Sequence, residues 1–150
     1  MTFRKILAPV DYSANSRVSL GLAVDLARKF SAGLEIVHVW DRPTYLTEAM
    51  MTVHGTGERR LTDLIAENAE HDMETFLAEV PLPTDVPYGH HLLSGDPASE
   101  LLREIESGAY DLVVLGTHGR SGLSRLLLGS IAEKIVRHAA VPVLTVPRRA

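Results

Sequence analysis

The sequence predicts an α/β protein built on one open, parallel five-stranded sheet with helices on both faces. Short apolar segments alternate along the chain with longer segments of helical periodicity, which is typical of this class. The first apolar segment, residues 3–10, is an almost continuous run, as expected for a strand buried on both faces. The length of 150 residues suits one domain, and no linker or internal repeat interrupts it. We therefore expect one domain over residues 1–150.

Composition narrows the class further. With 45% hydrophobic and 23% charged residues, the chain is neither disordered nor fibrous. It has no apolar run near the roughly 20 residues of a membrane span, and residues 1–11 lack the features of a secretory signal. The absence of cysteine excludes disulfide and thiol chemistry, and a net charge of −4 argues against general nucleic-acid binding. We expect a soluble, cytoplasmic protein with no membrane or nucleic-acid partner.

The first half of the chain predicts two strands and two helices. Ser13 is a candidate N-cap for a helix whose apolar residues recur every four positions and which ends near Gly33. A second strand is expected over 34–40. The connection 41–57 is long enough to be a lid or mobile loop, and a second helix is expected to begin at Glu58.

The second half continues the alternation. A weaker strand is expected over 86–93, followed by the Gly-Asp-Pro turn 95–97, which supplies an N-cap and a proline at the first helical position. Residues 110–115 form a fourth strand, 130–138 a short helix and 141–146 a fifth strand.

Pro142 places the last strand at an edge of the sheet. Proline cannot donate a ladder hydrogen bond, so it is confined to edge strands or to strand starts. An apolar edge over 141–146 invites aggregation unless it is covered. We therefore predict a homodimer formed through this strand.

Ligands of an open parallel sheet bind beyond the carboxyl ends of its strands, where the strand order reverses. Pro9, Val10 and Asp11 follow the first strand, and Val39 with Trp40 ends the second. The segment 116–130 follows the fourth strand and holds several glycines before a helix begins.

This glycine-bearing segment is the strongest candidate for an anion site. Glycine lets the main chain approach a ligand closely, and a helix N-terminus attracts anions through its unpaired N–H groups and its dipole. Arg120 and Arg125 add positive charge, so the segment suits a polyphosphate. These residues also have structural interpretations that need no ligand. Ser130 and Glu133 match a capping box, and Asp11 could cap the first helix.

Other chemistry is not indicated. The Walker pattern is missing, the first strand is not followed by a dinucleotide fingerprint, and no Gly-x-Ser-x-Gly elbow occurs. Seven histidines include no HExxH motif, and His90 and His91 should point to opposite faces of a strand, so we expect no metal site formed by protein ligands. No residue stands out as a catalytic base.

The spacing Gly116, two residues, Gly119, nine residues, Gly129-Ser130 resembles the nucleotide-binding pattern of the universal stress protein family. The segment 6–11 with Ser13, the strand 37–39, the turn 95–97 and the segment 141–144 are similar to the family in type and order. The resemblance implies a Rossmann-like, adenine nucleotide α-hydrolase-like fold that binds ATP, with Mg²⁺ or Mn²⁺ as a possible companion ion, and a homodimer.

The same resemblance implies roles for individual residues. Asp11 would contact the adenosine, Val10 and Val39 would line the adenine pocket beside Pro9, and Leu115 would approach the ribose. The residues expected near the ribose and phosphates are Gly116, His118, Gly119, Arg120, Gly129, Ser130 and Ile131.

Three kinds of function remain open on the sequence. The first is a regulatory ATP-binding protein of the stress response with at most slow hydrolysis. The alternatives are a nucleotide-dependent transferase or hydrolase of the same fold, or a member that works by protein contact without a nucleotide.

Overall fold

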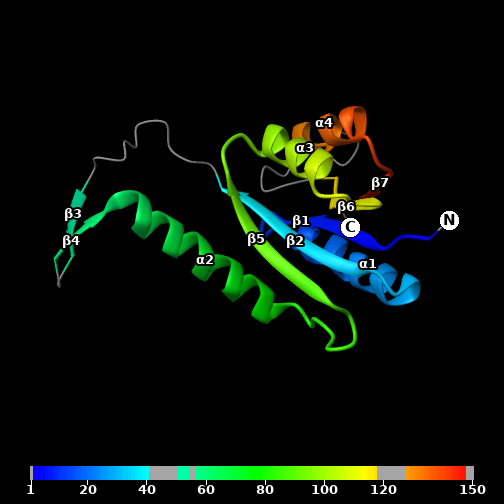
Figure 1. The fold of residues 1–150 in the computed structure, drawn as a ribbon, viewed down its shortest axis with the longest axis horizontal. Coiled ribbons are helices and arrows are strands. Elements are labelled where there is room, and N and C mark those ends of the chain that lie inside the picture. Colours follow the sequence, from blue (N-terminus) through cyan, green and yellow to red (C-terminus); the bar gives the residue numbers. More distant parts are fainter. Residues whose placement is uncertain (1, 41–50, 55–56, 118–127, 148–150) are drawn as a thin grey trace.

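The structure is a computed structural model that describes residues 2–40, 51–54, 57–117 and 128–147. Within these residues, five strands form one parallel sheet in the order β5-β2-β1-β6-β7 (Figure 1). Its strands are β1 (Lys5–Pro9), β2 (Gly33–Trp40), β5 (Tyr88–Ser94), β6 (Leu112–Gly116) and β7 (Val143–Val146). The predicted α/β class and parallel sheet are confirmed.

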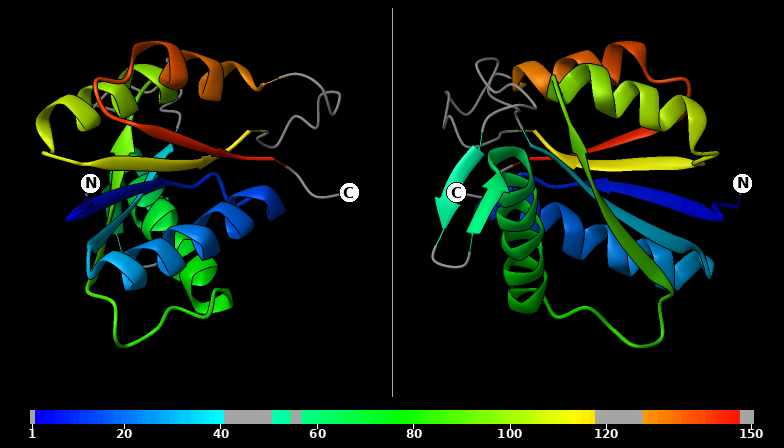
Figure 2. Two further views of the ribbon diagram at one scale, coloured as in Figure 1. Left: turned by 90° about the vertical axis from the view of Figure 1, so that its right-hand side faces the viewer. Right: turned by 60° about the vertical axis from the view of Figure 1, so that its left-hand side comes forward.

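Helices cover both faces of the sheet (Figure 2). Helices α1 (Ala14–Phe30) and α2 (Leu61–Glu79) lie on one face, and α3 (Pro97–Ser107) and α4 (Ser130–His138) on the other. The core is accordingly divided: Leu20, Met73 and Phe76 pack on the first face, and Leu101 and Ile135 pack on the second.

The order of the strands creates a switch point between β1 and β6. From β1 the chain adds β2 and then β5 outward on one side, and it then returns to place β6 and β7 on the other side of β1. Loops at the carboxyl ends of β1 and β6 therefore diverge to opposite faces and leave a crevice between them.

The predicted helix starts are confirmed at two places. Ser13 caps α1, because its Oγ accepts the Ser16 N–H at 3.1 Å. Asp96 caps α3 in the same way through the Ser99 N–H at 3.0 Å, with Pro97 in the first turn. In both cases the side-chain oxygen satisfies a backbone donor that the helix leaves without a partner.

The predicted start of the second helix at Glu58 is wrong. Glu58 lies in β4 (Gly57–Arg60), which pairs antiparallel with β3 (Met51–His54), and α2 begins only at Leu61. Part of the expected loop 41–57 is thus a hairpin, and residues 41–50 and 55–56 lie outside the described residues. Helical periodicity marks a buried face, but it does not reveal that the turn before it pairs with another strand.

Strand boundaries differ from the predicted ones by at most two residues. The final strand starts at Val143 instead of 141, because Pro142 has no N–H to donate, although its C=O accepts the Val113 N–H at 3.0 Å. Strand β7 is at the sheet edge, as Pro142 predicted. His90 contacts Glu70 of α2 and His91 contacts Glu104 of α3, so the two rings do face opposite sides.

A candidate nucleotide-sized pocket at the switch point

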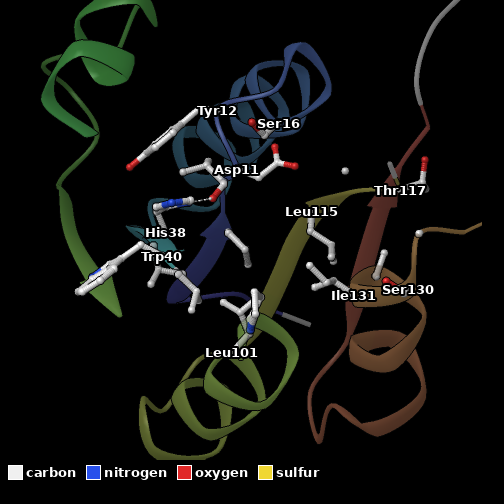
Figure 3. A pocket seen from close by; sticks show the side chains of 18 of the residues that line it. Asp11, Tyr12, Ser16, His38, Trp40, Leu101, Leu115, Thr117, Ser130 and Ile131 are labelled. Carbon is white, nitrogen blue, oxygen red and sulfur yellow. Dashed lines mark hydrogen bonds between the residues drawn. The ribbon is translucent and has the colours of Figure 1, made fainter. Parts of the chain in front are cut away.

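A pocket of about 580 Å³ lies at the carboxyl ends of β1, β2 and β6. This volume falls within the roughly 300–1,000 Å³ of small-molecule and cofactor sites. Figure 3 shows Tyr12, His38 and Trp40 on one side of it and Thr117, Ser130 and Ile131 on the other. The pocket therefore bridges the two halves of the sheet at the switch point.

Every predicted site residue within the described part of the chain lines this pocket. These residues are Pro9, Val10, Asp11, Val39, Leu115, Gly116, Gly129, Ser130 and Ile131. The other three predicted residues, His118, Gly119 and Arg120, lie outside the described residues, as does Arg125.

Further lining residues were not predicted as site residues from the sequence. They are Tyr12, Ser16, Val37, His38, Trp40, Ala69, Asp72, Pro97, Leu101, Thr117 and Ala132. Trp40 and Thr117 lie in the stretches that the sequence analysis considered after the strands, and Tyr12 and His38 directly adjoin predicted positions, so a window one residue wider would have included all four. Ala69 and Asp72 come from α2, and no local signal in the sequence connects that helix with the site.

One end of the pocket is largely apolar and carries a cluster of rings. The Tyr12 ring lies 4.2 Å from the His38 ring and 5.2 Å from the Phe76 ring, centroid to centroid. Tyr12 has a φ of +65°, an uncommon conformation for a residue with a side chain. The left-handed turn after β1 thus directs the Tyr12 ring over β2 and toward α2.

Asp11 has a local structural role as well as a place in the pocket. Its Oδ1 accepts the Ser13 N–H at 3.0 Å, so it holds the residue that caps α1. The alternative in which Asp11 itself caps the helix is wrong, because Ser13 is the N-cap residue; the contribution of Asp11 there is the hydrogen bond to that capping residue. It does not compete with ligand contact, because a carboxylate has two oxygens and about four acceptor positions.

The opposite end of the pocket is the N-terminus of α4. Gly129 is the N-cap residue, and no side chain in the described part of the chain caps the helix, so the capping-box alternative for Ser130 and Glu133 is wrong. The Gly129 N–H donates to the Thr117 C=O at 2.7 Å, which ties the helix start to the end of β6. In this geometry Gly129 fixes the position of the helix, and the donors left at its end are the N–H groups of Ser130, Ile131 and Ala132.

Gly116 is required by packing. A Cβ at this position would lie 2.4 Å from Nδ2 of Asn15, a distance that real contacts do not reach. Asn15 is buried, and its Nδ2 reaches the Val146 C=O at 3.4 Å. The glycine that the sequence associates with phosphate therefore also lets α1 lie close to β6.

Charge in the described lining is negative. Asp11 and Asp72 are acidic, and none of the described lining residues is a lysine or arginine. Any anion at this site would therefore depend on backbone N–H groups, on a bound cation or on residues 118–127. Among the described residues, no group of three or more His, Cys, Asp or Glu side chains is placed to hold a metal ion.

The fold and the site together define an open parallel α/β protein with a pocket at its switch point. The sequence model of the universal stress protein family matches residues 2–147. Universal stress protein MJ0531 of Methanocaldococcus jannaschii is 30% identical over 146 residues, which cover 97% of this chain and 83% of that protein. The chain belongs to the universal stress protein family.

Solved structures agree on the fold. Hypothetical protein MJ0577 superposes with a TM-score of 0.78 at 22% identity, over 100% of this chain and 99% of that one. A universal stress protein in complex with cAMP gives a TM-score of 0.59 at 21% identity, over 97% and 98% of the two chains. None of the helices in the described part is long and apolar enough to cross a membrane.

Proposed function

We propose that this protein binds ATP in the switch-point pocket and acts as a nucleotide-dependent regulator in the cytoplasmic stress response. The observation that carries the proposal is the pocket itself, which is lined by all the described residues that the family pattern selects. The universal stress protein solved with cAMP, an adenine nucleotide, is consistent with it, although that likeness concerns the fold alone.

The two ends of the pocket match the two ends of a nucleotide. Val10, Val39 and Leu101 supply an apolar surface for a base near the Tyr12 and His38 rings. The N–H groups at the start of α4, which have no partner among the described residues, supply donors for phosphate oxygens, and the helix dipole favours the negative charge. Such a ligand would lie across the switch point with its base at β2 and its phosphates at α4.

A divalent ion fits the same arrangement. Mg²⁺ is commonly bound through substrate phosphates, waters and one or two carboxylates. Asp11 and Asp72 are the carboxylates of the described lining, and Asp11 adjoins the turn that leads into α1. When bound, the ion would neutralise phosphate charge that the described residues do not offset with lysine or arginine.

We further propose that the protein is a homodimer through β7. The edge of this strand carries the exposed Leu144, and the two helices packed on β7 carry further exposed apolar side chains. Those are Val18 and Leu22 of α1 and Val136 of α4. Exposed apolar side chains beside a sheet edge that no described strand pairs with favour pairing with a second copy.

Calorimetry with added ATP, combined with analysis of small molecules released from the denatured protein, tests the nucleotide proposal. We expect binding of ATP and loss of that binding in Gly129→Val. Gly129 has φ −60° and ψ 149°, a conformation open to any residue, so the variant should fold. Gly21→Val, at an open helical position remote from the pocket lining, is the matched control. Wild-type protein that neither carries nor binds an adenine nucleotide would refute the proposal.

A further inference from the structure

We propose that His38 is a positioning residue that makes the pocket selective for adenine. Its side chain takes over one hydrogen bond of the β1–β2 ladder and thereby leaves the backbone of Val39 available to a base. This inference rests on the proposed function, because it assigns the part of the nucleotide that β2 recognises.

The register of the sheet shows which way each backbone group of β2 points. The Gly33 N–H donates to Arg4 C=O at 2.9 Å, and Val37 C=O accepts the Val10 N–H at 2.8 Å, so the odd-numbered residues of β2 face β1. The Leu34 N–H donates to Pro87 C=O at 2.9 Å, and Trp40 C=O accepts the Gly95 N–H at 3.2 Å, so the even-numbered residues face β5.

The next bond of a regular parallel ladder would join the Val39 N–H to the Val10 C=O. In the described part of the chain this bond is not formed. The Val10 C=O lies 2.7 Å from Nδ1 of His38 instead (Figure 3). A carbonyl oxygen only accepts, so this contact assigns the proton to Nδ1.

The ring cluster holds His38 in this position. The His38 ring lies at 31° to the ring of Tyr12, which follows Val10 by two residues and has a left-handed backbone where the chain passes from β1 to α1. Strand β1 ends at Pro9 while β2 continues to Trp40. The N–H and C=O of Val39 therefore point past the end of β1, on the side where the pocket lies.

One donor and one acceptor on a single residue match the edge of adenine. The N1 atom of adenine accepts a hydrogen bond and its 6-amino group donates one, so the Val39 N–H and C=O complement both. Guanine presents the opposite pattern on this edge, a donor at N1 and an acceptor at O6. A site that is built for one pattern leaves polar groups unpaired with the other, which is the basis of strong discrimination.

Two variants separate the hydrogen bond from the bulk of the ring. His38→Phe keeps an aromatic ring against Tyr12 but has no donor, so the Val39 N–H is expected to close onto Val10 C=O. We expect His38→Phe to bind ATP about tenfold more weakly and to have a smaller ratio of ATP affinity to GTP affinity than the wild type. His38→Asn has an N–H donor bonded directly to Cγ, as Nδ1 is in histidine. We expect this variant to restore both the ATP affinity and the preference for ATP over GTP. His90→Phe, on β5 and outside the pocket lining, is the control and should leave both unchanged.

Amide hydrogen exchange in the ligand-free protein tests the same inference without nucleotide. We expect slow exchange at Val37, fast exchange at Val39, and slow exchange at Val39 in His38→Phe. Slow exchange at Val39 in the ligand-free wild type would overturn the assignment, as would a His38→Phe variant with an unchanged ATP to GTP preference. Failure of the wild type to bind any adenine nucleotide would instead refute the proposed function, while the exchange at Val39 still decides whether His38 replaces the ladder bond.

Discussion

The side-chain amide of Asn15 occupies the space beside Gly116 that a Cβ would need, with only 2.4 Å between the two positions. Asn15 lies in the first turn of α1, and Gly116 is the last residue of β6. This contact joins the helix that follows β1 to the strand on the other side of the switch point, so the pocket and the fold depend on the same glycine.

Gly116→Ala should therefore destabilise the fold. Because Asn15 is buried, it cannot move without disturbing α1, and we expect a loss of about 1–3 kcal/mol in the free energy of unfolding. Urea unfolding measures the change. Gly21→Ala is the matched control: it lies within α1 with nothing within 4 Å, and it should gain about 0.5–1 kcal/mol from helix propensity. Equal stabilities of the Gly116 variant and the wild type would contradict the packing role.

Replacing Asp96 by alanine should weaken the start of α3. The carboxylate accepts the N–H of Ser99 at 3.0 Å and its hydroxyl at 2.7 Å, and an unsatisfied donor remains once it is removed. We expect a loss of about 1 kcal/mol for Asp96→Ala in thermal or urea unfolding. Asp96→Ser retains a side-chain oxygen that can cap the helix, so it should recover most of the lost stability. Similar losses of stability in the two variants would contradict the capping role of Asp96.

Acid should weaken the attachment of β1 through Asp111. Backbone hydrogen bonds from Arg4 at 2.7 Å and Lys5 at 3.0 Å hold the pKa of Asp111 below its ordinary value of 3.8. The ionised carboxylate therefore stabilises the fold at pH values above 3.8, and this stabilisation is lost as the pH falls through the lower folded-state pKa.

Urea midpoints measured between about pH 7 and about pH 3 check this expectation. Asp111→Asn should be less stable than the wild type at neutral pH, and the difference should shrink on acidification. Asp25→Asn, on the exposed side of α1, is the control. A difference between Asp111→Asn and the wild type that stays constant with pH would show that the charge is not involved.

The dimer proposal predicts opposite outcomes at the two edges of the sheet. Leu144→Asp on β7 should convert a dimer of about twice 16.4 kDa to monomer, because it buries a charge at the paired edge. Tyr88→Asp on β5, at the opposite edge and also exposed, should leave the dimer intact. Analytical ultracentrifugation distinguishes these cases, and a wild type that sediments as monomer at micromolar concentration would refute the dimer.

The sequence predicted the alternation of strands and helices because apolar periodicity and capping residues such as Ser13 and Asp96 act over a few neighbouring positions. It also predicted β7 as an edge strand, since Pro142 lacks a donor whatever surrounds it. The glycine pattern correctly predicted a site at the carboxyl end of β6. The structure places the described residues of that pattern in one pocket with Val10 and Val39.

Other features depend on partners that are distant in the sequence, and only the tertiary structure decided them. The hairpin of β3 and β4 replaced the first turn predicted for α2, because strand pairing competes with local helical pattern. Gly116 must be glycine because the side chain of Asn15 packs against it, and the N–H of Gly129 donates to the C=O of Thr117. Neither contact can be predicted from the neighbouring sequence. The hydrogen bond from His38 to Val10 arises because β1 ends before β2, and the relative lengths of two neighbouring strands are fixed only when the sheet assembles.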